Sequence, residues 1–195
     1  MKKEEIKEIL SKSKVAVAGL GGLGSNIAVM LARSGVGHLR LIDFDVVEES
    51  NLNRQAYSLS DIGKPKAGAL LEILNGINPK AEYEIFQLKI TPDNVEELFR
   101  GFPVVCEALD SAQEKAMLVR EVLLKCPGAT VVSGNGMVGF GAANEIVTEQ
   151  KMKRLYVCGD FKTGIEDTDV ILAPRVMICA GHQANKAIEL ILEGK

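Results

Sequence analysis

The sequence predicts an α/β protein with an open, mostly parallel sheet, helices on both faces and an antiparallel C-terminal part. Three observations carry this prediction. Short continuous apolar runs recur along the chain, and such runs are typical of strands covered on both faces. Segments with apolar residues at helical spacing alternate with these runs as far as the fifth one. A glycine-rich turn directly follows the first run.

The first part of the chain has the pattern of a Rossmann-like nucleotide-binding unit. Val15–Ala18 has the pattern of a buried strand, and a complete G-x-G-x-x-G follows it at Gly19–Gly24. Apolar residues then lie at helical spacing over Ser25–Ala32, and a second strand, His38–Ile42, ends at Asp43. This succession of strand, glycine turn, helix and strand with a terminal acid predicts a nucleotide site.

Each glycine of the turn has an expected task. Gly19 allows the tight turn, Gly21 lets the backbone approach a phosphate, and Gly24 lets the helix pack closely against the strand. The amides at the start of the helix would then face an anion. Asp43 lies where this fold places a carboxylate that accepts hydrogen bonds from ribose hydroxyls. We therefore expect a nucleotide to contact Gly19, Gly21, Gly22, Gly24 and Asp43.

The same patterns place the remaining elements. Thr91 is expected to cap a helix, and Ser111 opens another with the capping-box spacing to Glu114. Helices are expected at 3–12, 66–76, 91–99 and 111–125, and strands at 83–88, 103–108 and 130–133.

Beyond the fifth strand the regular alternation stops. Glycines punctuate residues 134–147, which we expect to be β-rich. Residues 148–172 are mixed and charged, and they are expected to form a crossover loop over the site. An apolar-rich helix should run from Pro174 to about Leu192, since proline suits the first turn of a helix.

Composition limits the function classes. The 195 residues are 47% hydrophobic and 25% charged, which fits one globular domain spanning 1–195. A net charge of −3 gives no sign of the basic surface that is typical of nucleic-acid-binding proteins. No apolar run approaches the roughly 20 residues that cross a bilayer, and the charged start is not a signal peptide. We expect a cytoplasmic protein with neither nucleic-acid nor membrane partners.

A second motif makes the nucleotide site more specific. The string DFDVVEESNLNRQ at 43–55 resembles the D-x-D-x-V-x-x-S-N-L-x-R-Q signature of the ThiF/MoeB family, bacterial adenylyltransferases related to ubiquitin-activating enzymes. The resemblance continues at 61–67, 77–79, 108–111 and 173–188, in family order and at family-like spacing. It covers nearly the whole chain and is most like a short ThiF-type sulfur carrier protein adenylyltransferase.

The resemblance implies an activity. Such an enzyme uses ATP and Mg²⁺ to activate the C-terminal glycine carboxylate of a small ubiquitin-like, ThiS-like sulfur carrier protein ending in Gly-Gly. The pathway would be thiamine biosynthesis or a related sulfur transfer. Relatives form two-fold homodimers, and residues 131–147 with the last helix could supply the self-complementary surface.

Site residues follow from the same match. Arg54 and Lys66 match the family's phosphate-binding cations, and Asp110 matches the aspartate that holds magnesium. Asn51 and Gln55 match polar residues around the phosphates, and Asp45 belongs to the same nucleotide site. Lys64 is the alternative to Lys66 as the phosphate-binding lysine. Asp110 could also cap the helix that starts near Ser111.

The sequence departs from the family in its cysteines and its N-terminus. No C-x-x-C pair is present, so the cysteine zinc site of many relatives cannot form and no zinc is expected. Relatives also carry an N-terminal arginine that reaches the phosphates, whereas this chain has only lysines before the glycine turn.

One cysteine and two histidines need separate predictions. Some relatives use a cysteine after the fifth strand as a nucleophile, and Cys158 is the candidate, because lysines and arginines surround it in an irregular segment. His38 is expected in a surface turn, and His182 is expected to be structural.

Two other interpretations remain. An NAD-dependent oxidoreductase would explain the glycine turn and Asp43 but leave Arg54, Lys66 and Asp110 without a role. A nucleotide-binding relative without catalysis is the second, since the N-terminal arginine is missing.

Overall fold

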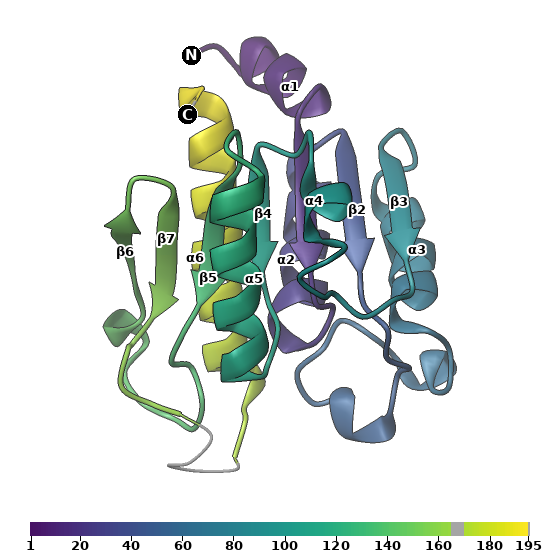
Figure 1. The fold of residues 1–195 in the computed structure, drawn as a ribbon. Coiled ribbons are helices and arrows are strands. Elements are labelled where there is room, and N and C mark those ends of the chain that lie inside the picture. Colours follow the sequence, from purple (N-terminus) through teal and green to yellow (C-terminus); the bar gives the residue numbers. More distant parts are fainter. Residues whose placement is uncertain (165–169, 195) are drawn as a thin grey trace.

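A seven-stranded sheet organises the part of the chain that the computed structural model describes, residues 1–164 and 170–194. The strand order is β3-β2-β1-β4-β5-β7-β6, and only the pairing of β6 with β7 is antiparallel (Figure 1). The strands are β1 (Lys14–Ala18), β2 (His38–Ile42), β3 (Glu82–Phe86), β4 (Val104–Glu107), β5 (Thr130–Gly134), β6 (Val147–Met152) and β7 (Leu155–Gly159). The predicted fold class is confirmed.

Helices cover both faces of this sheet. The α-helices are α1 (Lys3–Ser11), α2 (Gly22–Ser34), α3 (Lys66–Ile77), α4 (Val95–Phe99), α5 (Ala112–Lys125) and α6 (Ala173–Glu193). Short 3₁₀ turns are η1 (Glu49–Asn51), η2 (Leu59–Asp61) and η3 (Ala143–Glu145).

Two cores follow from the alternation of side chains along the strands. Val15 and Val17 of β1 point into a core with α2, α3 and α6, whereas Ala16 and Ala18 point into a core with α4 and α5. Because both faces are buried, the central strands are continuously apolar, as the sequence suggested. In Figure 1 α4 and α5 lie in front of the sheet and α2 and α6 behind it.

The carboxyl ends of the parallel strands meet at one edge of the sheet. At that edge β1 ends at the glycine turn, β2 ends before Asp43, and β4 ends before Asp110. This edge is at the lower end of the sheet in Figure 1, with the segment between β2 and α3 folded beneath it. Ligands of open α/β sheets bind at such an edge.

The C-terminal part differs from the prediction. Residues 134–147 are not β-rich: β5 ends at Gly134, and an irregular loop with η3 follows. The predicted crossover loop 148–172 instead contains most of β6 and all of β7, and its residues 165–169 lie outside the described part. The polar, exposed pattern of β6 is that of an edge strand, because charged side chains there discourage pairing with other chains.

Two local predictions are also wrong. The helix expected from Thr91 begins only at Val95, with Asn94 as its N-cap, and the Asn94 side chain accepts a hydrogen bond from the Thr91 amide. His38 is not in a surface turn: it starts β2 and is buried against the ring of Phe102 in a T-shaped contact, at a centroid distance of 5.2 Å. His182 contacts the Thr148 hydroxyl through Nδ1 at 3.0 Å.

Candidate active site

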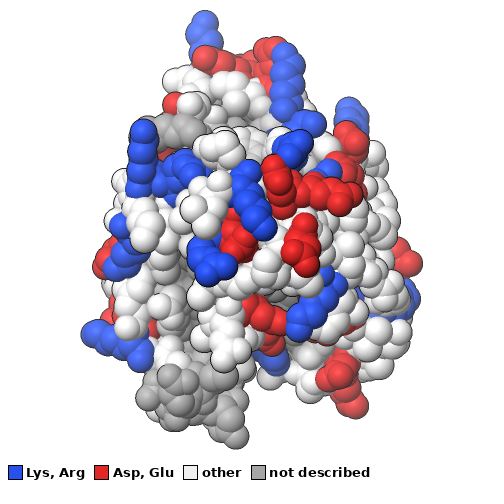
Figure 2. All heavy atoms as spheres, in the orientation of Figure 1, with Lys and Arg blue, Asp and Glu red and all other residues white. Residues whose placement is uncertain are grey.

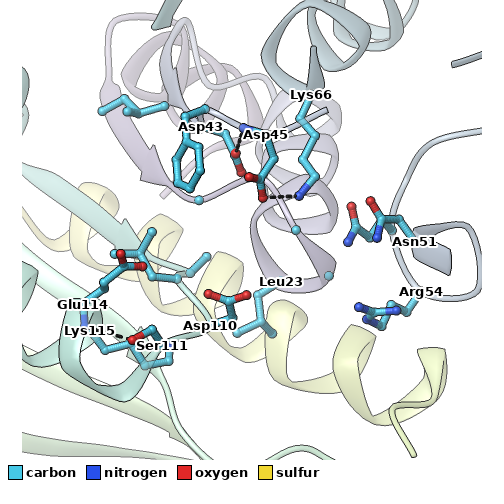
Figure 3. A pocket seen from close by; sticks show the side chains of 18 of the residues that line it. Leu23, Asp43, Asp45, Asn51, Arg54, Lys66, Asp110, Ser111, Glu114 and Lys115 are labelled. Carbon is cyan, nitrogen blue, oxygen red and sulfur yellow. Dashed lines mark hydrogen bonds and ion pairs between the residues drawn. The ribbon is translucent and has the colours of Figure 1, made fainter. Parts of the chain in front are cut away.

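A cavity of about 760 Å³ opens over the carboxyl ends of β1, β2 and β4. Figure 3 shows that it has two sides: the segment from Asp43 to Lys66 forms one, and the start of α5 with the residues before it forms the other. The predicted site residues that line this cavity are Gly19, Gly21, Gly22, Asp43, Asp45, Asn51, Arg54, Gln55, Lys66 and Asp110. Gly24 lies in the first turn of α2 and, like Cys158, does not line the cavity.

The glycine turn has the geometry that its sequence predicts. Gly19 has a φ of +86°, a conformation in which a side chain is strained. A Cβ on Gly24 would lie 1.8 Å from the carbonyl oxygen of Gly19, so only glycine allows α2 to approach the turn. A Cβ on Gly21 would meet nothing closer than 3.8 Å, which leaves its backbone open toward the cavity.

The N-terminus of α2 faces the cavity without a side-chain cap. Gly21 is the N-cap residue, and no side chain bonds the first helical amides. The first amides of a helix have no intrahelical partner, and the helix dipole adds partial positive charge there. This end of α2 is therefore suited to an anion such as a phosphate.

Side chains of α2 hold the segment that carries Arg54 and Gln55. The Asn26 amide donates to the carbonyls of Gly22 and Arg54, at 2.7 and 3.0 Å. The Ser25 hydroxyl accepts from the amide of Ala56 at 3.1 Å. These bonds fix Arg54 beside the first turn of α2. The guanidinium and the helix amides therefore lie at the same region of the cavity.

Arg54 and Lys66 differ in how far their charges are neutralised. Arg54 makes no ion pair with any residue of the described ranges, and only its Nη1 donates, to Ser50 O and Asn53 Oδ1. Lys66 is buried, and its Nζ lies 2.8 Å from Oδ2 of Asp45. Figure 3 shows this pair above Asn51 and Arg54. Asp45 thus holds the lysine at the cavity wall.

The geometry distinguishes Lys66 from its rival. Lys64 pairs with Asp61 at 3.2 Å and Glu72 at 2.8 Å, outside the cavity lining. These partners raise the pKa of Lys64. Lys66 is the lysine that lines the cavity.

Asp43 and its neighbours form a polar floor. The carboxylate of Asp43 accepts hydrogen bonds from the amides of Leu20 at 2.6 Å and Asp45 at 2.8 Å. It is thereby fixed at the end of β2, and its oxygens have lone pairs left to accept further hydrogen bonds. Asn51 is buried and accepts from the amide of Glu48 at 3.1 Å. Gln55 is also buried, and its Oε1 has no hydrogen-bond partner within the described residues.

Asp110 lies on the opposite side of the cavity from Lys66 and is exposed (Figure 3). It makes no ion pair with the residues that the structure describes, and Ser111, not Asp110, caps α5 by accepting from the amide of Glu114. Mg²⁺ is commonly held by one or two carboxylates together with substrate phosphates. A single free carboxylate facing a phosphate site fits that donor set.

The sequence interpretation missed Glu107, which anchors the loop that carries Asp110. Glu107 is 0% exposed and accepts from the Leu109 amide at 2.7 Å, from Lys115 Nζ at 3.1 and 3.0 Å, and from the hydroxyl of Ser133. A carboxylate inside an apolar strand was the signal that could have found it, because buried charges need partners. Its bonds set the position of Asp110 at the cavity.

A buried ion pair supports the far wall of the cavity. Asp160, just after β7, pairs with Arg175 in the first turn of α6. Arg175 also donates to the carbonyl of Ala142 at 3.3 Å. The pair therefore joins the loop after β5, the end of β7 and α6, next to the cavity-lining residues Val138 and Val176.

Cys158 contradicts the prediction about its surroundings. It lies in β7 and is fully buried, not in an irregular segment among cations. Burial raises the pKa of the Cys158 thiol to about 11, although the Thr148 hydroxyl lowers it somewhat. The thiol therefore stays protonated near neutral pH, and a strongly nucleophilic thiolate is not available there.

Comparison with known proteins matches nearly the whole chain to one family. A family model described as "ThiF family" matches residues 2–195. The chain is 37% identical over 118 residues to the Escherichia coli tRNA threonylcarbamoyladenosine dehydratase, which covers 60% of this chain and 44% of that protein. It is 36% identical over 103 residues to a probable adenylyltransferase/sulfurtransferase MoeZ of Mycobacterium tuberculosis, covering 52% and 26%.

The fold has a solved counterpart. The crystal structure of the Escherichia coli dehydratase in complex with ATP superposes with a TM-score of 0.87 at 23% identity, over 98% of this chain and 90% of that one. The two sequence matches described above, to the dehydratase and to MoeZ, each cover less than half of the relative's own sequence. In sequence, this chain therefore aligns with only part of each relative.

Proposed function

The chain belongs to the ThiF family, and from this premise we propose that residues 1–195 act as one adenylation domain that transfers AMP from ATP to a carboxylate. The carboxylate oxygen attacks the α-phosphorus, the bond from that phosphorus to the bridging oxygen breaks, and pyrophosphate leaves. The product is an acyl-adenylate. The obstacle is the approach of one anion to another, so fixed positive charge is the main requirement.

One observation carries this proposal: the uncapped start of α2, Arg54 and Lys66 converge on a single cavity that also contains Asp43 and Asp110. The α2 amides would hold phosphate oxygens, and Arg54 would hold them with the planar, two-pronged N–H groups of its guanidinium. Lys66 would exchange Asp45 for a phosphate oxygen. Asp43 would accept from the ribose, with Asn51 and Gln55 orienting the phosphates.

Asp110 would hold Mg²⁺ together with phosphate oxygens. The ion, when bound, neutralises charge on the phosphates and on the departing pyrophosphate. The residues of this chain position it: Glu107 and Ser111 hold the loop, and the Asp110 carboxylate faces the cavity.

The carboxylate that we propose is the C-terminal glycine of a ubiquitin-like, ThiS-like sulfur carrier, in thiamine biosynthesis or a related route in the cytoplasm. The name of the mycobacterial relative, adenylyltransferase/sulfurtransferase, supports a sulfur-transfer setting. A nucleic-acid substrate is disfavoured by the net charge of −3. Figure 2 shows acidic and basic side chains interspersed on the face that carries α4 and α5, without one basic patch.

The oxidoreductase interpretation is weaker. It uses the glycine turn and Asp43, but it gives no task to the unpaired Arg54 or to Asp110. The family match covers nearly the whole chain and supports adenylation instead.

ATP–pyrophosphate exchange tests the proposal. Exchange should appear only when a carrier ending in Gly-Gly is added, and a carrier that lacks the final glycine should be the matched negative control. Exchange driven by tRNA instead of the carrier would replace the substrate assignment. Nucleotide binding without exchange for either would indicate a non-catalytic relative.

We expect Asp110→Asn to raise the Mg²⁺ concentration needed for half-maximal exchange. The substitution keeps the shape of the side chain but removes the charge that attracts the cation. Titration of exchange activity with magnesium measures this, with Ser111→Ala as the control for the cap of α5. An unchanged magnesium titration in Asp110→Asn would remove the residue from the metal site.

We also propose a homodimer. Phe140, Met177 and Val147 are exposed on the loop after β5, on α6 and on β6, and such apolar side chains suit an interface. Sedimentation at high micromolar concentration with nucleotide present should show a dimer that Phe140→Glu weakens. A monomer under these conditions contradicts the proposal.

A further inference from the structure

A second polar cluster lies at the opposite end of the sheet from the cavity. His38 opens β2, and its register partner Glu82 opens β3; Arg40 and Glu84 form the next pair along the same two strands. Since residues two apart on a strand share a face, His38, Arg40, Glu82 and Glu84 lie on one side of the sheet. In Figure 1 this is the upper end of β2 and β3, far from the segment around the cavity.

The imidazole of His38 is the buried centre of this cluster. The residue is 7% exposed, and both ring nitrogens are buried. Glu84 Oε1 lies against Nε2, and Glu82 Oε2 lies 3.6 Å from Nδ1. One oxygen of each glutamate and a ring nitrogen lie within 4.8 Å of one another. Nδ1 thus has no hydrogen-bond partner among the described residues, and Glu82 at 3.6 Å is beyond hydrogen-bond distance from it. A buried polar nitrogen normally has a partner, so Nδ1 calls for an explanation.

The surroundings hold two of these side chains in place. Arg40 donates to Oε2 of Glu84 from Nε at 3.1 Å and from Nη2 at 2.5 Å, which leaves Oε1 directed at the histidine. The ring of Phe102 packs edge-on against His38 and also lies under the Arg40 guanidinium at 4.3 Å. Arg40 therefore holds the Glu84 carboxylate in one orientation.

We propose that His38, Glu82 and Glu84 bind a divalent transition-metal ion of the zinc type. Zn²⁺ accepts imidazole nitrogen and carboxylate oxygen, and in open zinc sites three protein ligands leave the fourth position to water. Mg²⁺ and Ca²⁺ prefer all-oxygen sites, so the imidazole favours zinc over them. Arg40 supplies the outer hydrogen bond that orients a ligating carboxylate. The exposed Glu82, 70% accessible at its side chain, is free to close over the ion.

The ion would join the edge strand β3 to β2. This site is separate from the cysteine zinc site that the sequence lacks, because its donors are one imidazole and two carboxylates. It is also separate from the adenylation chemistry, since none of its residues lines the cavity. We therefore expect the ion to raise thermal stability and to leave pyrophosphate exchange unchanged.

The chain has only two histidines, His38 and His182, so ring-proton NMR reports on this site directly. One equivalent of Zn²⁺ added to metal-free protein should shift the His38 signals and not those of His182. At a free zinc concentration 100 times the Kd, Tm should rise by about 5–10 °C. Mg²⁺ should produce neither effect.

Glu82→Gln removes one ligand at an exposed position and should still fold. It is expected to raise the zinc concentration for half-saturation at least tenfold. Glu149→Gln, on the opposite edge strand β6, is the matched control and should bind zinc like the unmodified protein. The proposal fails if zinc leaves the His38 signals unchanged, or if Glu82→Gln binds zinc as tightly as the unmodified protein does. In either case His38 forms ion pairs with the glutamates and binds no metal.

Discussion

Arg54→Ala is expected to slow ATP–pyrophosphate exchange by about 10²–10³-fold, the usual loss for one preorganised donor that stabilises transition-state charge. The reason is local. Arg54 packs beside the first turn of α2, and its Nε and Nη2 have no partner in the described ranges. Its charge is therefore available to phosphate oxygens, whereas that of Lys66 is shared with Asp45. Steady-state exchange at saturating ATP and carrier measures the loss.

Two further variants separate geometry from charge. Arg54→Lys should recover little activity, because a point charge does not reproduce the two-pronged contact of a guanidinium. Asn53→Ala is the matched control: it removes a partner of Arg54 at an exposed position and should retain most exchange activity. Near-normal exchange in Arg54→Ala would mean that the α2 amides and Lys66 suffice.

The nucleotide unit could be predicted from the sequence because its determinants are local. The conformation of Gly19 and the close approach at Gly24 are requirements that only glycine meets, and they appear directly as a spacing. Asp43 followed from the nucleotide-binding pattern and Asp110 from the family match, and both lie at the carboxyl edge of the parallel strands. Lys66 could not be separated from Lys64 by sequence, because the difference lies in tertiary partners: Asp45 for one, Asp61 and Glu72 for the other.

The C-terminal part was not predictable to the same extent. The edge strand β6 buries almost nothing, so its sequence VTEQKM carries no apolar alternation. Its partner β7 is a short apolar run within the segment predicted to be a loop, so Cys158 was expected among nearby cations but is buried in a strand. Glu107 was missed and the prediction for His38 was wrong for a related reason. A polar residue in a buried strand is accommodated by partners distant in sequence, which are Lys115 and Ser133 for Glu107 and Glu84 for His38.

Arg175→Ala is expected to lower the free energy of unfolding by about 3–5 kcal/mol, because it leaves the carboxylate of Asp160 buried without its counter-charge. The amides of Lys162 and Thr163 still donate to that carboxylate, each at 2.9 Å, so the lower end of this range is expected. For a chain of this size the loss corresponds to a fall in Tm of roughly 6–12 °C. Urea unfolding at neutral pH measures it.

The Asp160–Arg175 pair should also affect how the free energy of unfolding depends on pH. Burial alone would raise the pKa of Asp160, but the hydrogen bonds from Thr163 and Lys162 and the charge of Arg175 outweigh it and hold the pKa below the ordinary 3.8. A carboxylate with a lowered folded-state pKa stabilises the fold above its unfolded pKa, and this contribution is lost as pH falls through the folded value. The difference in unfolding free energy between the unmodified protein and Arg175→Ala should therefore narrow as the pH is lowered from 7 to below about 4.

Asp160→Asn combined with Arg175→Met should recover much of the stability, since no buried charge then remains unpaired. A loss below about 1 kcal/mol in Arg175→Ala, or a gap that does not change with pH, would show that the pair contributes nothing to the fold beyond its hydrogen bonds.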